Sequence, residues 1–153
     1  MITGDLFRER VPFERLAPSL LLALTLCAPA LRLAAVGDIQ MGQGWPEDQQ
    51  KLPPDDAADF FSAVAPILRD ADLTFGNLET TLADSGDSHK CDRRKKPCYA
   101  YRVPTAFAQR LADAGFDVVS LANNHAQDFG KPGIAQTVEA LDRVHVRYSG
   151  ANG

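Results

Sequence analysis

The chain has 153 residues, of which 45% are hydrophobic and 24% are charged, and its net charge is -4 at pH 7. This length suits one domain or part of one. The acidic balance provides no general attraction to nucleic acid, and the basic run at 93–96 is short and has no interleaved aromatic residues, so we expect no nucleic-acid partner.

Residues 1–30 have the pattern of an export signal. An apolar stretch from Leu16 to Leu26 follows Arg15, and Ala28-Pro29-Ala30 has the small-x-small form of a cleavage site. The stretch is short for a membrane span. The alternatives are a membrane-proximal helix or a buried N-terminal helix. We therefore predict an exported protein that is periplasmic or associated with the cell envelope.

Strand-like and helix-like segments alternate along the rest of the chain. A buried strand is expected at 31–36, where Gly37 would allow a tight turn that presents Asp38, and a loop at 42–54. Asp55 or Asp56 would cap a helix reaching Leu68, in which Pro66 would bend or restart the last turn. The remaining expected elements are strands at 72–75, 99–103, 116–121 and 146–148, and helices at 104–115 and from 132 onward. This alternation predicts an α/β fold with a largely parallel or mixed sheet.

Three polar motifs follow apolar runs. They are Gly37-Asp38-Ile39-Gln40, Gly76-Asn77-Leu78-Glu79 and Asn123-Asn124-His125. Strand ends in α/β folds direct such side chains into one crevice, and their oxygen and nitrogen atoms suit divalent metals. Each residue taken singly could be a turn or loop residue, but the repeated placement favours a site.

Cys91 and Cys98 enclose a polar loop at 84–98, and a pair of cysteines in an exported chain suggests a disulfide. A zinc site formed by His89, Cys91 and Cys98 is the alternative, but it lacks a fourth ligand and the usual cysteine spacing. His89 and His145 are expected to be solvent-exposed. Trp45 with Pro46 is expected to anchor its loop or to form a rim contact.

Four segments carry a family resemblance: AVGDI at 35–39, DLTFGNLETTL at 72–82, DAGFDVVSLANNHAQDFG at 113–130 and VRYSGA at 146–151. They resemble the N-terminal half of the bacterial CapA family of capsule and poly-γ-glutamate biosynthesis, which is related to calcineurin-like metallophosphoesterases. The resemblance implies a four-layer α-β-β-α sandwich with a metal centre at its strand ends. Residues 31–153 would be an incomplete N-terminal part of a domain roughly twice this size.

The resemblance also implies roles for individual residues. Asp38 matches the first metal-ligating aspartate, Asn124 matches a metal-binding asparagine, and His125 matches the histidine that steadies or protonates the reacting group. Asn77 and Glu79 occupy the second metal motif, where Glu79 is the better anionic ligand.

Two further positions depart from the phosphoesterase pattern. Gln40 stands where phosphoesterases place a ligating histidine, and Asn123 replaces a glycine and would shape the loop. Gln40 and Asn123 would hold the metal ligands in position without binding the metal themselves. The expected cofactor is a divalent ion, for which Mn, Fe, Zn and Mg all remain open.

Two functions follow from these expectations. The first is a metal-dependent hydrolase acting on an anionic envelope polymer, such as poly-γ-glutamate, or on a phosphoester. The second is a non-catalytic component of polymer assembly or export, alone or within a biosynthesis complex at the envelope. Asp38 and His125 favour the first function, and Gln40 favours the second. Because the expected metal shell is incomplete, we expect the 153-residue polypeptide alone to be poorly active.

Overall fold

The computed structural model describes residues 30–46, 50–92 and 98–150, and the fold lies within the unit Leu31–Gly153. The predicted export segment and the basic run at 93–96 therefore fall outside the described residues, apart from Ala30. Within the described part of the chain, no helix is long and apolar enough to cross a membrane.

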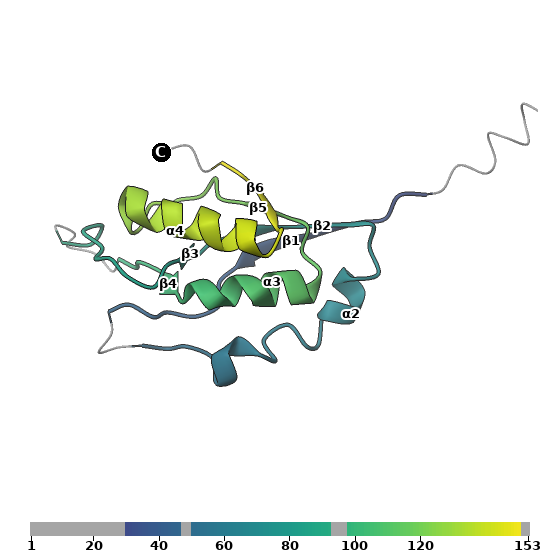
Figure 1. The fold of residues 1–153 in the computed structure, drawn as a ribbon, viewed down its shortest axis with the longest axis horizontal. Helices are drawn as coiled ribbons and strands as arrows, with labels where there is room; N and C mark the ends of the chain where they lie inside the picture. The colour runs from purple at the N-terminus through teal and green to yellow at the C-terminus, as the bar shows by residue number, and fades with distance from the viewer. Residues whose placement is uncertain (1–29, 47–49, 93–97, 151–153) are drawn as a thin grey trace, which may run out of the picture. The chain divides into compact units, whose positions relative to one another are not determined.

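A four-stranded parallel sheet with the order β1-β2-β5-β6 forms the framework (Figure 1). Its strands are β1 (Leu33–Ile39), β2 (Leu73–Leu78), β5 (Val118–Ser120) and β6 (Arg147–Ser149). A second, two-stranded parallel sheet joins β3 (Thr81–Leu82) to β4 (Arg102–Val103). The predicted α/β class with a parallel sheet is confirmed, whereas strand β3 was not predicted.

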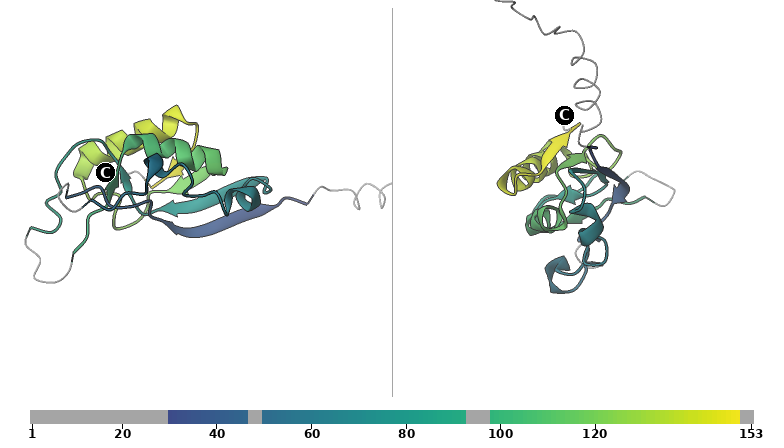
Figure 2. Two further views of the ribbon diagram at one scale, coloured as in Figure 1. Left: turned by 90° about the horizontal axis from the view of Figure 1, so that it is seen from below. Right: turned by 90° about the vertical axis from the view of Figure 1, so that its right-hand side faces the viewer.

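Helices α3 (Ala108–Ala114) and α4 (Gly130–Arg143) lie on the same side of the four-stranded sheet (Figure 2). The 3-10 turn η4 (Thr105–Phe107) leads into α3, as the predicted helix at 104–115 requires. Gly115 ends α3 with a φ of 95°, a left-handed conformation that glycine adopts without a Cβ penalty. The helices therefore cover one face of the sheet.

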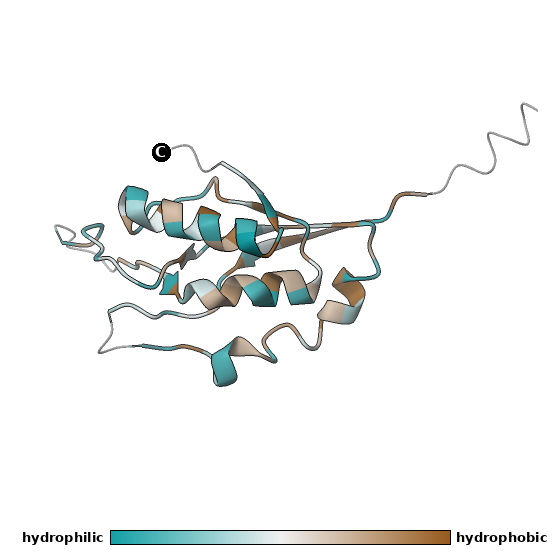
Figure 3. Ribbon diagram, viewed as in Figure 1, coloured by the Kyte–Doolittle hydropathy of each residue, from teal (hydrophilic) through white to brown (hydrophobic). Residues whose placement is uncertain are grey.

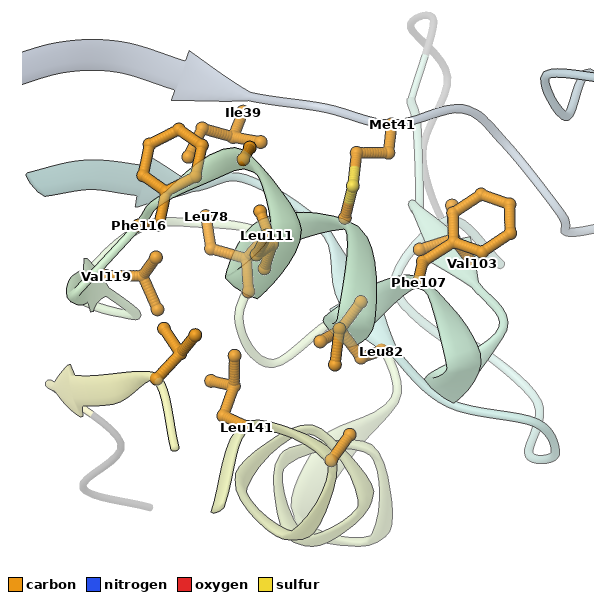
Figure 4. Close-up of a cluster of buried hydrophobic side chains, with 14 of the residues drawn as sticks. Ile39, Met41, Leu78, Leu82, Val103, Phe107, Leu111, Phe116, Val119 and Leu141 are labelled. Atoms are coloured by element: carbon orange, nitrogen blue, oxygen red, sulfur yellow. The ribbon is translucent and has the colours of Figure 1, made fainter. Parts of the chain in front are cut away.

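The hydrophobic core fills the space between the sheet and these two helices (Figure 4). Leu78 and Val119 point into it from neighbouring strands, and Leu111 of α3 and Leu141 of α4 meet them with no measurable exposure. Burying each such side chain stabilises the fold by roughly 1.5–3 kcal/mol. This packing holds the sheet, and the site at its carboxyl edge, in place.

Strand β1 is much more exposed than predicted. Leu33 is 62% exposed and Val36 is 37% exposed, so the expectation of a fully buried strand is wrong. The reason is position, because β1 is at the edge of the sheet, where it pairs only with β2 within the described residues. In Figure 3 the ribbons of β1 and of α2 (Ala65–Leu68) carry apolar colour.

The single helix predicted from Asp55 to Leu68 is also wrong. Asp55, Asp56 and Ala57 have positive φ angles of 52°, 50° and 59°, and they form the 3-10 turn η3 (Asp55–Ala57), which has no side-chain cap. Pro66 lies in the first turn of α2. Proline has no N–H to donate and suits the first turn of a helix, so α2 begins here, in agreement with the restart that was one of the two outcomes expected at Pro66.

A polar site at the strand ends

A shift in register between β1 and β2 positions Asp38. Ala35 pairs with Phe75, but Asp38 pairs with Asn77, so β1 contains one more residue than β2 across this interval. Such an extra residue re-aims the side chains that follow it. Gly37 lies within β1 and forms no tight turn, which corrects the prediction, and the irregular register brings Asp38 opposite Asn77.

Asn77 joins the two carboxylates of the site. Its Nδ2 donates to Oδ1 of Asp38 at 2.8 Å and to Oε2 of Glu79 at 2.7 Å. Asp38 is exposed, while Asn77 and Glu79 are half-buried. One amide therefore gathers two acidic groups that come from different strands' ends.

Asn123 determines which way the Asn77 amide points. Its Oδ1 accepts hydrogen bonds from the backbone N–H of His125 at 3.0 Å and of Ala126 at 2.9 Å. Its Nδ2 therefore faces the other way and donates to the Leu78 carbonyl at 2.9 Å and to Oδ1 of Asn77 at 3.1 Å. Since Asn77 must accept there, its own Nδ2 is turned toward the carboxylates.

His125 lies between Glu79 and a buried acid. Its Nε2 is 3.8 Å from Oε1 of Glu79, and its Nδ1 is 2.7 Å from Oδ2 of Asp128. The Asp128 side chain is fully buried and accepts further hydrogen bonds from Lys90 Nζ at 2.5 Å and from the backbone N–H of Tyr101 at 2.8 Å. A carboxylate only accepts, so Nδ1 carries the hydrogen and Nε2 is left facing Glu79.

Sequence reasoning missed Asp128, Lys90 and Tyr101. Asp128 had a detectable signal, since it lies three residues after His125 in the same polar segment and could reach the same side of a turn. Lys90 and Tyr101 had none, because they approach from a distant part of the chain.

The side chains of two predicted residues lie apart from the network. Nε2 of Gln40 donates to the Gly42 carbonyl at 3.1 Å, and Gln40 is exposed. Asn124 is exposed beside a cavity of about 500 Å³ that Leu121 and Ile134 also line. The structure thus brings together Asp38, Asn77, Glu79, Asn123 and His125, but not Gln40 or Asn124.

The donor types suit a divalent ion, although the arrangement is not a closed shell. Carboxylates at Asp38 and Glu79 and the imidazole of His125 are ligands that such ions take. The amide nitrogen of Asn77 contacts both carboxylates, and a cation bound by both would have to replace its hydrogen bonds. Across residues 30–46, 50–92 and 98–150, no group of three or more His, Cys, Asp or Glu is placed to hold a metal.

Cys91 and Cys98 form a disulfide with their Cα atoms 5.6 Å apart. Both sulfurs are thereby engaged, which weighs against the zinc alternative. The side chain of His89 is 86% exposed beside Asp92, and His145 is also exposed, as expected. Trp45 packs edge-on against Phe129 with ring centroids 5.8 Å apart, a contact that fits a loop anchor.

A parallel α/β sheet with carboxylate, amide and imidazole groups at its carboxyl edge is typical of a protein that binds or transforms a ligand at that edge. The model of the family described as bacterial capsule synthesis protein PGA_cap matches residues 32–153, and the chain belongs to that family.

Two curated relatives agree with this assignment. The chain is 31% identical over 123 residues to the capsule biosynthesis protein CapA of Bacillus anthracis, covering 79% of this chain and 28% of the relative. It is 30% identical over 125 residues to the PGA biosynthesis protein CapA of Bacillus subtilis, covering 78% of this chain and 31% of the relative. The match thus spans less than one third of either relative's length.

Proposed function

We propose that the site is part of a metal-dependent hydrolase that acts on an anionic polymer of the cell envelope or on a phosphoester. The observation that carries this proposal is the convergence of Asp38 and Glu79 on Asn77, with Nε2 of His125 only 3.8 Å from Glu79. Two acids and an imidazole so arranged suit metal-assisted hydrolysis and proton transfer.

Asp38 and Glu79 would hold the ion, with Asn124 as a further ligand after its side chain turns toward them. A bound divalent ion supplies activated water or polarises the substrate. His125 presents Nε2 on the Glu79 side, because Asp128 holds Nδ1 at 2.7 Å. From that position Nε2 can orient the reacting group or transfer a proton to it. The hydrogen bond to Asp128 supports this orientation of His125, whereas ion binding would replace the hydrogen bonds from Asn77 to Asp38 and Glu79.

The cellular setting is proposed from the relatives. Their names refer to capsule and PGA biosynthesis, so we propose an exported, envelope-associated protein that meets an anionic polymer, alone or within a biosynthesis complex. The four-layer sandwich belongs to the same proposal. Its support is the sheet face opposite α3 and α4, where Leu33 and Leu73 remain exposed at 62% and 36%. Apolar surface of this kind favours a covering layer.

The second candidate is a non-catalytic component that holds the polymer during assembly or export. The observation that favours it is Gln40, which bonds to its own loop and brings no nitrogen ligand to the carboxylates. In that case Asp38, Asn77 and Glu79 would form a structural network only.

The deciding experiment measures metal content and hydrolysis of a generic phosphodiester and of poly-γ-glutamate. It uses the protein at its full natural length, Asp38→Ala and His125→Ala, with His145→Ala as the control at an exposed histidine outside the network. The hydrolase proposal expects bound metal and turnover in the wild type and control, reduced metal in Asp38→Ala and lost turnover in both site variants.

Metal-free, inactive protein that still binds poly-γ-glutamate would support the assembly role instead. Turnover that survives in both Asp38→Ala and His125→Ala would contradict the assignment of this site.

A further inference from the structure

The segments on either side of the Cys91–Cys98 disulfide both contact the His125–Asp128 pair. Lys90 directly precedes Cys91, and its Nζ lies 2.5 Å from Oδ1 of Asp128, 3.1 Å from Nδ1 of His125 and 3.0 Å from the Asn124 carbonyl. Tyr101 follows Cys98 by three residues. Its backbone N–H donates to Asp128, and its ring centroid is 4.4 Å from that of His125.

Lys90 supplies the positive charge that pairs with the buried carboxylate of Asp128. The Asp128 side chain is 0% exposed, and a buried carboxylate is costly unless it is paired and hydrogen-bonded. Lys90 provides the cation, and its own side chain is only 20% exposed. The ion pair therefore stabilises the acid that in turn holds Nδ1 of His125.

Tyr101 restricts the imidazole in a different way. Its ring lies along the face of His125, with the two planes inclined by 31°. The side chain of His125 is 12% exposed, so little of it is open to solvent. Lys90 and Tyr101 together limit both the rotation and the accessibility of the imidazole.

The disulfide provides the constraint that keeps these residues in place. Its cysteines are separated by 7 positions, and the bond joins the segment that carries Lys90 to the segment that carries Tyr101. A lysine side chain loses much rotational freedom when it is immobilised, and a fixed neighbouring backbone reduces the total ordering cost. The covalent link thus favours simultaneous contact by Lys90 and Tyr101.

We propose that Lys90 and Tyr101 are positioning residues for His125 and that the Cys91–Cys98 disulfide holds them there. This inference rests on the proposed function in taking His125 as the reacting side chain. It adds a dependence on oxidation: reduction of the disulfide loosens Lys90 and Tyr101 and leaves His125 less restrained and more accessible.

The test measures carbethoxylation of histidines by diethyl pyrocarbonate at constant pH, with each site quantified by mass spectrometry. His125 is compared with His145, an exposed internal reference, in the oxidised full chain and after reduction. Dithiothreitol breaks the Sγ–Sγ bond to give two thiols and becomes a cyclic disulfide, and the thiols are then alkylated. Local opening of this kind is expected to raise the His125 rate at least about fivefold relative to His145.

Variants at Lys90 separate positioning from a general loss of structure. Lys90→Met should raise the rate of His125 relative to His145 in oxidised protein, and Lys90→Arg, which keeps a positive charge that can pair with Asp128, should leave this ratio close to that of the wild type. Lys51→Met is the matched control at an exposed lysine. Circular dichroism confirms that each sample is folded, and the reduced wild type serves in place of any variant that does not fold.

An unchanged His125 rate in folded, reduced wild type would overturn the proposal, as would an equal rise in Lys51→Met. This readout requires no turnover, so it distinguishes the two proposals. An inactive protein whose His125 responds to reduction keeps the positioning role and loses the hydrolase role. An active protein whose His125 does not respond to reduction keeps the hydrolase role and loses the positioning role.

Discussion

Nδ1 of His125 lies 2.7 Å from the buried carboxylate of Asp128, and this contact turns the other imidazole nitrogen toward Glu79. The acid is itself held by Lys90 and by the Tyr101 backbone. Hydrogen bonds within the protein thus establish the orientation of His125, and this is the orientation that the proposed function requires.

Removing the Asp128 carboxylate should destabilise the fold. Asp128→Ala leaves Lys90 without its buried partner, which typically costs about 3–5 kcal/mol. Asp92→Ala removes an exposed carboxylate beside His89 and is expected to cost at most about 1 kcal/mol. Urea unfolding of both variants measures the difference, and equal losses would contradict a structural role for the buried ion pair.

Asn123 and Asn124 are adjacent but should differ in their effect on stability. Asn123→Ala removes the acceptor for two backbone N–H groups and the donor to Asn77, at a cost of about 1–3 kcal/mol. Asn124→Ala alters an exposed side chain and should change stability by no more than about 0.5 kcal/mol. Thermal and denaturant unfolding check this contrast, which a larger loss in Asn124→Ala would disprove.

The glycines of the first two motifs provide a second matched pair. A Cβ at Gly76 would lie 2.5 Å from Ile39 Cδ1 and 2.9 Å from Val36 Cγ2, so Gly76→Ala should cost about 1–3 kcal/mol through overpacking. A Cβ at Gly37 meets no described atom within 4 Å, and Gly37→Ala should be neutral or stabilise by up to about 1 kcal/mol. The free energies of unfolding of the two variants measure this difference. A loss of stability in Gly37→Ala as large as that in Gly76→Ala would refute the packing argument.

Two buried threonines should respond in opposite ways to replacement by valine. Thr80 Oγ1 is buried without a hydrogen-bond partner among the described residues, so Thr80→Val should be neutral or stabilising. Thr137 Oγ1 accepts from the Leu82 N–H at 3.0 Å and donates to the Gly133 carbonyl at 2.9 Å. Thr137→Val should therefore cost about 1–3 kcal/mol. Differential scanning calorimetry measures both, and a clear loss in Thr80→Val would show that its hydroxyl has an unseen partner.

Metal should stabilise the protein if the proposed ion binds the folded state. An excess of Mn²⁺ at about 100 times its Kd adds about 2.7 kcal/mol, which raises the Tm, and a chelator should reverse the shift. Asp38→Ala should abolish this response, whereas Asp59→Ala, which alters an exposed acid distant in sequence from the motifs, should keep it. An unchanged response in Asp38→Ala would exclude Asp38 as a ligand for that ion.

Much of the fold could be read from local patterns. The continuous apolar run before Leu121 predicted β5, and Gly115 marked the end of α3, because apolar periodicity and glycine conformation act over a few residues. The predicted burial of β1 and the predicted continuous helix at 55–68 were wrong. Edge position decides how much of a strand is exposed, and backbone conformations at Asp55 and Asp56 broke the helical spacing.

The candidate site was likewise predicted only in part. Polar residues following apolar runs predicted one site from all three motifs, because parallel strands end at one edge, and the structure brings together five of these residues but leaves out the side chains of Gln40 and Asn124. Their individual roles depended on hydrogen bonds that no local pattern contains. Only those bonds show that Asn77 donates to both carboxylates and that Gln40 does not join them.

The amino-acid sequence by itself determined the α/β class, the alternation of strands and helices, and the motifs that supply Asp38, Asn77, Glu79, Asn123 and His125. Tertiary structure alone decided the register that pairs Asp38 with Asn77 and the burial of Asp128 beneath His125. It also decided the approach of Lys90, which is 38 residues from Asp128 along the chain. Short-range propensities act between neighbours, whereas pairing of a buried charge depends on which distant segments the folded core brings together.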